Sequence, residues 1–588
     1  MTRERWGWVA PIRRGLLAAA GGCGLLGFLA HYGFHVPVSL LWLPEALRGV
    51  AVGGFLLEGI LAALTVRPWR AFLRARWPLL ALTVLLAGEL LALAFGGSRW
   101  LAPLAGLLSV QTVAQVYVVA LQAFVLGNLL ANLPRVSERL AAWKVRPLFI
   151  FLLAFVVVIL LGALLLSLPR ATPREHPISF VDALFTSTSA VCVTGLVVRD
   201  TGAEFTRLGH WIILGLIQLG GLGIMSVTAT MLLLFGRGLG LKQGSLLREI
   251  YQIDFLDQVG RTLRFIVAFT VVAEAAGALL LYHGLRGAVA DRGERLFYAA
   301  FHAVSAFCNA GFSLFPDNLA SFAGRPQVYL PVAALLVAGG LGFPVVGNVL
   351  FSWRARLAHE PPGPHRRLTV QTRAVLRTTA ILLGLGTVAL ALLEWNGAFA
   401  GRAWGERLGL AFFQAASPRT AGFNTVDLLT LAESSLVLQI VLMFIGASSG
   451  STGGGIKTNT LAVLWANLRA IATANPRARL FDREIGVTAS RQAFFVFLAH
   501  LAVATLAVIV LLWTERAPLL PIGYEVYSAL GTVGLSLNFT PTLSLAGRLV
   551  IILVMFFGRV GPLSIAYGVV RPTHERGVRM PESRLMVG

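Results

Sequence analysis

The chain has 588 residues, of which 56% are hydrophobic and only 13% are charged, whereas about 25% of the residues of a soluble protein are charged. Apolar runs of roughly 20 residues recur along the whole length, and each is long enough to cross a bilayer as a helix. Composition therefore excludes an ordinary soluble protein and predicts an all-α membrane protein.

The net charge of +22 is interpreted as an orientation signal and not as a sign of nucleic-acid binding. With twelve spans and the N-terminus inside, more than half of the 49 Lys and Arg residues fall in seven cytoplasmic segments, as the positive-inside rule requires. These segments are 1–15, 67–76, 134–147, 236–261, 353–373, 469–491 and 571–588. We therefore expect a multi-pass protein of the inner (plasma) membrane with both termini in the cytoplasm and no nucleic-acid partner.

In chain order, residues 1–145 predict an N-terminal extension of about four transmembrane helices, and four degenerate repeats follow. The repeats are 146–250, 251–368, 369–480 and 481–588, the last with a cytoplasmic tail. Each contains a span, an apolar segment of about three helical turns, and a second span, the second spans lying near 209–235, 328–351, 436–468 and 546–570. The short segments cannot cross a bilayer, and irregular backbone is tolerated at membrane depth only around a water-filled cavity. We interpret them as pore loops around a central pore.

The four pore loops align without gaps when each is anchored on one glycine. These glycines are Gly195, Gly311, Gly422 and Gly534, at intervals of 116, 111 and 112 residues. Ten residues before each stands an aromatic residue (Phe185, Phe301, Phe412, Tyr524), and six residues before each stands a small one (Ser189, Ser305, Ala416, Ser528). A second glycine landmark begins in the middle of each following span, at Gly220, Gly339, Gly446 and Gly558. Close helix packing is the simpler interpretation for Gly220 and Gly339.

Four pore loops around one axis can present rings of backbone carbonyls that replace the hydration shell of an ion. Glycine accepts positive φ, which lets the carbonyls turn toward the axis, and no acidic residue stands beside the four glycines. Main-chain oxygens would therefore select the ion, which suits potassium better than calcium. The polar neighbours Thr194, Asn309, Thr420 and Thr532 are expected to hydrogen-bond the loop backbone. The predicted filter comprises Val191, Cys192, Val193, Thr194, Gly195, Phe307, Cys308, Asn309, Ala310, Gly311, Pro418, Arg419, Thr420, Ala421, Gly422, Leu530, Gly531, Thr532, Val533 and Gly534.

The second span of the third repeat contains ten small residues in a row, which cannot form a stable continuous helix. They are Gly446, Ala447, Ser448, Ser449, Gly450, Ser451, Thr452, Gly453, Gly454 and Gly455, followed by Ile456-Lys457-Thr458. This run predicts an unwound intramembrane loop below the filter that acts as a gate. A phosphate-binding loop is the alternative, but the spacing differs from the Walker pattern and no strand precedes it.

Charged residues within spans are candidates for function because each costs about 2.5–3.5 kcal/mol at mid-bilayer. They are Glu58, Glu89, Glu274, Lys457 and Arg559, with Glu394 near an interface. Arg559 stands at the glycine landmark of the last span. Our hypothesis is that it projects into the ion path against the carbonyls of the small-residue loop and, with Lys457, forms part of the gate. A salt bridge between Arg559 and Glu274 is the alternative.

At these residues the chain resembles the TrkH/KtrB family of potassium transporters, whose superfamily includes plant HKT and fungal Trk proteins. The resemblance covers about 145–588, including the filter segments, GSTGGGIKT at 450–458, Arg559 and the tail at 580–588. It implies transport of K⁺, in some members of Na⁺, by a homodimer in membrane lipid, with no cofactor in this chain. It also implies a cytosolic KtrA/TrkA-like ring that binds nucleotide. Carried over to this chain, the four glycines form the filter with K⁺ held by backbone oxygens near them, the 446–455 loop is the gate and Arg559 is the barrier.

Two other functions are alternatives. The first is a Na⁺-permeable or cation-coupled symporter of the same superfamily; a coupled carrier should have titratable residues that converge at mid-membrane, but Glu58, Glu89 and Glu274 lie on different spans. A membrane enzyme would need acids, histidines or a nucleophile gathered near one interface, and the ten histidines are scattered. We therefore predict a transporter and no enzymatic activity.

Overall fold

The computed structural model describes residues 147–235, 259–359 and 367–569, together with scattered positions between 12 and 61. The chain divides into two units, one made of Met1–Trp143 and Leu168–Pro177 and the other of Lys144–Ser167 and Ile178–Gly588. The second unit contains all of the predicted filter and gate. The helices predicted within 1–145 and the tail at 580–588 lie outside the described residues, apart from the scattered positions.

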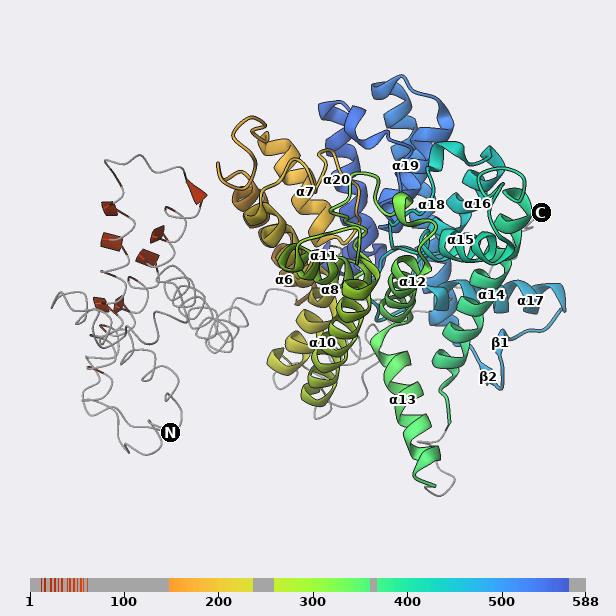
Figure 1. The fold of residues 1–588 in the computed structure, drawn as a ribbon. Helices are drawn as coiled ribbons and strands as arrows, with labels where there is room; N and C mark the ends of the chain where they lie inside the picture. The colour runs from red at the N-terminus through yellow and green to blue at the C-terminus, as the bar shows by residue number, and fades with distance from the viewer. Residues whose placement is uncertain are drawn as a thin grey trace. The chain divides into compact units, whose positions relative to one another are not determined.

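The second unit is built almost entirely of helices (Figure 1). Each predicted repeat opens with a long apolar helix: α6 (Pro147–Leu166), α10 (Val259–Gly284), α14 (Val370–Leu393) and α18 (Val487–Glu515). A shorter helix follows in each: α7 (Phe180–Val191), α11 (Arg292–Phe307), α15 (Trp404–Ala416) and α19 (Leu519–Gly531). The closing segments are α8 (Arg207–Phe235), α12 (Pro326–Leu341) with α13 (Phe343–Leu357), α16 (Glu433–Phe444) with α17 (Thr458–Ala472), and α20 (Leu545–Val560) with α21 (Pro562–Val569). The small elements are η4 (Ala320–Phe322), η6 (Leu428–Thr430), η7 (Thr540–Thr542) and the antiparallel hairpin of β1 (Arg479–Leu480) and β2 (Arg483–Glu484).

Several of these helices have the length and composition of membrane spans. Within the described residues, Arg264–Gly284, Val370–Leu393 and Val487–Glu515 qualify singly, and α12 with α13 qualifies as a bent pair. Their outer faces are apolar, since Leu385 and Leu392 on α14 are 68% and 74% exposed. Apolar side chains on an outer face need a lipid surround or another protein surface. The chain is therefore an all-α, multi-pass membrane protein.

Two of the predicted second spans contain a break in the helix. Near 328–351, Gly342 takes φ 90° and α12 and α13 meet there at 97°. Near 546–570, Gly561 takes φ 81° between α20 and α21. A proline follows each break, Pro344 as the second residue of α13 and Pro562 as the first residue of α21, so each left-handed glycine precedes a residue suited to a helix start. In the first repeat, α8 continues without a break over 29 residues.

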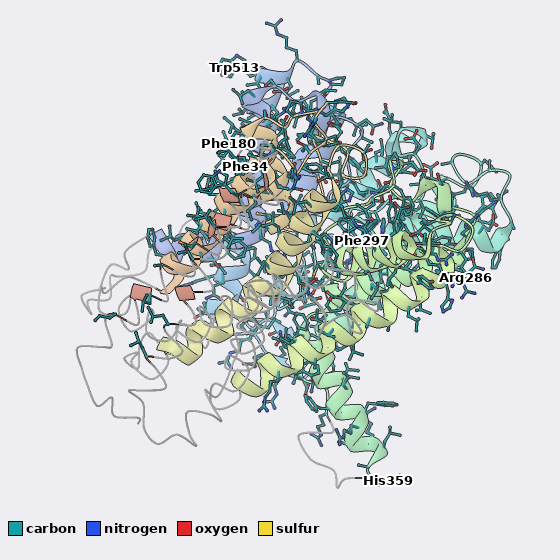
Figure 2. The ribbon with its side chains drawn as sticks, turned by 60° about the vertical axis from the view of Figure 1, so that its left-hand side comes forward. Phe34, Phe180, Arg286, Phe297, His359 and Trp513 are labelled. Atoms are coloured by element: carbon teal, nitrogen blue, oxygen red, sulfur yellow. The ribbon has the colours of Figure 1, made fainter. Side chains whose placement is uncertain are left out.

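The short helices lie enclosed among the long ones. α7 packs against α6, α8 and α20, while α19 packs against α16, α18 and α20. Figure 2 shows Phe180, at the start of α7, toward the same end of the bundle as Trp513, and His359 beyond the tip of α13 at the opposite end. α7 therefore begins near one end of the bundle and ends in its interior.

Candidate functional site

Two of the four short helices, α7 and α11, are capped by a side chain at their start. The Ser179 hydroxyl accepts a hydrogen bond from the Asp182 amide at 3.1 Å and caps the start of α7, and the Asp291 carboxylate caps α11 in the same way at 2.7 Å. Each short helix ends where a predicted filter segment begins. The negative ends of four helix dipoles therefore point toward the filter segments, which favours a cation there.

The four anchor glycines lie in a closed ring of contacts. A Cβ atom built on Gly195 lies 2.5 Å from the Ala310 carbonyl oxygen and 3.0 Å from the Gly311 Cα. In the same way Gly311 faces the Gly422 Cα at 2.9 Å, Gly422 faces the Gly534 Cα at 3.2 Å, and Gly534 faces the Gly195 Cα at 2.9 Å. Segments that are more than 100 residues apart in sequence thus meet around one centre, and a side chain at any of the four positions would strike a neighbour.

The backbone of each filter segment takes positive φ at two positions. The anchor glycines have φ between 72° and 96°, and the residue two before each is also left-handed. Those residues are Val193 (φ 56°), Asn309 (φ 60°), Thr420 (φ 74°) and Thr532 (φ 51°). For β-branched residues this conformation costs about 1–3 kcal/mol each, so the surrounding structure must hold it in place. The sequence predicted positive φ for the glycines only.

Serine hydroxyls hold the turn between each short helix and its glycine. Ser189 and Ser528 each accept a hydrogen bond from the glycine amide six residues later at 3.0 Å, and Ser305 donates to the Phe312 carbonyl at 2.8 Å. In the third repeat it is Ser417, and not the predicted Ala416, that donates to a carbonyl, that of Phe423.

The third repeat is therefore one residue shorter between its serine and its glycine. The Ala421 amide bonds four residues back, to Ser417, where the other three repeats bond five residues back. The aromatic position shifts in step, because Phe413 is fully buried whereas the predicted Phe412 is only partly buried. The gap-free alignment of the third repeat is wrong, and the recurring four-residue spacing of aromatic and serine would have revealed it.

The predicted filter residues share one buried environment, with only Gly534 partly exposed. Asn309 donates to the Thr420 hydroxyl at 3.2 Å, and Thr532 accepts from the Gly454 amide at 3.0 Å. These side chains contact another repeat or the 446–455 loop, whereas the sequence predicted hydrogen bonds to the backbone of their own loops. The Thr194 hydroxyl is buried without a hydrogen-bond partner among the residues that the structure describes, and Val193 holds the equivalent left-handed position.

Glycines of the closing segments pack against the ends of the short helices. A Cβ atom on Gly220, Gly339 or Gly558 would strike the carbonyl oxygen of Val191, Phe307 or Leu530 respectively. Each of those carbonyls belongs to the residue four before an anchor glycine. The packing role predicted for Gly220 and Gly339 is thus supported, and it extends to the fourth repeat.

The small-residue run is a loop between α16 and α17, as its composition predicted. It is bound from several sides: the Ser448 amide donates to Gly340 O at 3.0 Å, the Thr452 amide donates to Gly339 O at 3.3 Å and the Gly455 amide donates to Gly558 O at 3.4 Å. The Thr452 hydroxyl lies 3.2 Å from the Phe307 carbonyl oxygen and 3.1 Å from Asn309 Oδ1. The loop therefore touches the filter segments directly.

Two cationic side chains contact carbonyls of this loop. The buried Arg559 guanidinium donates to Thr452 O through Nη1 and to Gly220 O of α8 through Nη2 at 2.6 Å. Lys457 donates to Gly453 O at 2.6 Å and lies 3.3 Å from Gly454 O. The Arg559 side chain therefore links the loop to the first repeat by donating to a main-chain oxygen of each.

Arg559 and Glu274 do not form the salt bridge that was the alternative role for Arg559. Glu274 instead accepts from Gln218 at 3.4 Å and lies near the Cys308 sulfur. Glu394 accepts from the Ala432 and Ala398 amides at 2.8 and 3.1 Å, so it caps α16, whose own N-cap residue offers no side-chain bond. Glu58 and Glu89 lie outside the described residues.

The chain was compared with known proteins. The TrkH family of cation transport proteins matches residues 143–573. The Ktr system potassium uptake protein B of Bacillus subtilis is 36% identical over 457 residues, 77% of this chain and 99% of that protein. The protein of the same name from Vibrio alginolyticus is 39% identical over 443 residues, 75% of this chain and 94% of that protein. The crystal structure of the potassium transporter TrkH from Vibrio parahaemolyticus superposes with a TM-score of 0.58 at 20% identity, covering 72% of this chain and 84% of that one, so the two share a fold.

These matches settle the class of protein. The family match covers most of the chain and all of the predicted filter and gate segments, and both relatives are aligned over almost their whole length. The relatives are transporters and not enzymes, in agreement with the prediction from the scattered histidines. This chain belongs to the TrkH family of cation transport proteins.

Proposed function

We propose that this chain is the ion-conducting subunit of a potassium uptake system and that K⁺ passes through the ring of Gly195, Gly311, Gly422 and Gly534. The two relatives compared above are potassium uptake proteins by name, which supports the choice of ion. The observation that carries the proposal is the closure of the ring, because each glycine contacts the next and the fourth contacts the first.

Main-chain oxygens of the four filter segments take the place of water around the ion. The negative ends of four helix dipoles point at the filter segments. In each segment two residues have left-handed backbone, which turns carbonyl groups away from the direction of a helix axis and toward the ion. Strained backbone persists only where packing fixes it, and here serine hydroxyls and buried aromatic side chains surround every turn. Such a filter selects by the spacing of its oxygens and not by net charge.

The Gly446–Gly455 loop and Arg559 form the gate. The loop lies against the filter segments of the second and fourth repeats through Thr452 and Gly454, so an ion that leaves the filter meets it. Arg559 adds a buried positive charge that repels a cation, and it holds the loop through Thr452 O. Opening requires the loop to leave these partners, which its lack of bulky side chains permits.

The remaining parts of the proposal follow from the family resemblance. The subunit forms a homodimer in the lipid of the inner (plasma) membrane with its termini in the cytoplasm, and a KtrA/TrkA-like ring that binds nucleotide controls the gate. The concentration of Lys and Arg in the segments predicted to be cytoplasmic supports this orientation.

Cation uptake into proteoliposomes tests the filter. We expect the parent protein to take up K⁺ and Rb⁺ much faster than Na⁺. Gly195→Ser places a Cβ atom 2.5 Å from Ala310 O at a left-handed position, so the ring must widen and the preference for K⁺ over Na⁺ must fall. Gly401→Ser is the matched control, because Gly401 also has positive φ (74°) but nothing lies within 4 Å of an added Cβ atom.

Each outcome has a distinct meaning. Equal Na⁺ and K⁺ uptake by the parent would refute the potassium assignment in favour of the Na⁺-permeable alternative. Uptake that requires a proton or sodium gradient would favour the coupled symporter. If Gly195→Ser and Gly401→Ser change selectivity equally, the ring is not the filter.

A further inference from the structure

A cavity lies beside the third pore loop, next to Ala416 and Arg419. It is lined by the end of α12, the middle of α14, the last residue of α15 and the gate loop, and its walls include Leu336, Val337 and Leu383. The polar side chains that line it are Arg419 and Thr379, and no carboxylate is among the lining residues. The unfilled space holds roughly one water-sized group.

Arg419 has no partner for its charge within the part of the chain that the structure describes. Its side chain is only 8% exposed, its Nε has no hydrogen-bond acceptor, and the guanidinium forms no ion pair there. The hydroxyl of Thr379 in the same cavity is also buried without a partner. Buried polar groups are nearly always hydrogen-bonded and buried charges are paired. Two unpaired donors on side chains that line one small cavity therefore point to an acceptor held between them.

The position of Arg419 indicates that this acceptor is an anion. Arg419 stands three residues before Gly422 and directly before Thr420, so its charge lies beside the segment that is to hold a cation. A water molecule would satisfy the hydrogen bonds but leave that charge uncompensated in apolar surroundings. A small anion satisfies the same donors and also removes the repulsion between the guanidinium and a cation in the filter.

We propose that this cavity binds one small monovalent anion of the size of chloride, held by the Arg419 guanidinium and the Thr379 hydroxyl. The limited free space excludes a lipid headgroup or a large organic anion. The consequence for transport, namely that the bound anion supports cation occupancy of the filter, rests on the proposed function, but the binding itself does not.

Bromide is the probe, because its anomalous scattering identifies it directly. Crystals of the full-length protein grown in bromide should show an anomalous peak between Arg419 and Thr379. The peak should be lost in Arg419→Met, which keeps the side-chain length but removes the charge, and weakened in Thr379→Val, which keeps the shape but removes the hydroxyl. A cavity that contains only water, or a peak that survives in Arg419→Met, would overturn the proposal.

Thermal unfolding in detergent gives a second measurement that needs neither crystals nor transport. The Tm of the parent should rise with bromide or chloride relative to gluconate at equal ionic strength, because a ligand that binds only the folded state stabilises it. The shift should disappear in Arg419→Met; if that variant does not fold, the shift should become smaller in Thr379→Val. Equal Tm values of the parent in chloride and gluconate would contradict the proposal. Cation uptake without a bromide peak would refute the anion site alone, whereas a bromide peak without cation uptake would refute the proposed function alone.

Discussion

Replacing Arg559 with alanine is the most direct test of the proposed gate. The guanidinium is buried, with 3% of the residue exposed, and it joins two carbonyl oxygens that belong to different repeats. Nη1 donates to Thr452 in the gate loop and Nη2 donates to Gly220 in α8 at 2.6 Å. Arg559→Ala removes both the tether on the loop and the fixed charge next to it.

The expected size of the effect follows from these contacts. A hydrogen bond that involves a charged group stabilises by about 1.5–3 kcal/mol. Loss of the bond to Thr452 therefore shifts the balance between the closed and the released loop by roughly tenfold to a hundredfold. Removal of the positive charge lowers the barrier for a cation in the same direction. We expect Rb⁺ uptake by the isolated subunit to rise about tenfold or more.

The assay is Rb⁺ uptake into proteoliposomes that contain equal amounts of folded protein. Arg559→Lys should give an intermediate rate, since a lysine keeps the charge but cannot bridge two carbonyls with a planar fork. Arg469→Ala, at an exposed arginine near the end of α17, is the control and should leave uptake unchanged. Unchanged uptake in Arg559→Ala, with normal incorporation, would refute the role of Arg559 in the gate.

Three further predictions concern the support of the bundle. Asp182→Asn should lower the free energy of unfolding by about 2 kcal/mol, because it removes the charge that pairs with Arg548 and Arg199. The loss should be below the roughly 3–5 kcal/mol of a fully buried pair, since the two arginine side chains stay 24% and 35% exposed. An unchanged Tm in detergent would contradict this. Glu394→Ala should cost about 1–3 kcal/mol by uncapping α16, and hydrogen exchange should localise the loss to that helix. The hydrogen bond from Arg373 lowers the pKa of Asp482, so the pair persists above the ordinary pKa of the carboxyl and is lost as the pH falls through the depressed one. Arg373→Gln should raise that pKa, as a carbon-13 NMR titration of the carboxyl would show.

Much of the site could be predicted from sequence because its constraints repeat. Glycine is required at four positions where any Cβ atom would strike a neighbouring segment. These four glycines can be recognised in the sequence by their regular spacing. The run from Gly446 to Gly455 has a composition that excludes a continuous helix, so the loop between α16 and α17 follows directly. Family membership could be predicted from the same residues.

The remaining features differ in how far the residue types indicate them. In the third repeat the buried aromatic residue and the bonded serine are Phe413 and Ser417, each one residue later than predicted. The turn that follows is one residue shorter, so the spacing of the anchor glycines does not reveal the shift. The left-handed backbone at Val193 contradicts the ordinary preference of a β-branched residue, so only packing can impose it. The breaks at Gly342 and Gly561 could have been inferred from the prolines that follow, Pro344 and Pro562.

The proposed filter takes one segment from each of the four repeats, but the proposed gate comes mainly from one. The loop of the third repeat contacts Asn309 of the second repeat and Thr532 of the fourth, and Arg559 connects it to Gly220 of the first. A single segment is therefore linked to the other three repeats, to the first of them through the Arg559 side chain. Because these contacts share one short loop, releasing one of them weakens the hold on the others, and we expect the path to open in one cooperative step. Four independent gates, one for each repeat, would instead produce partial conduction, which single-channel recordings can distinguish.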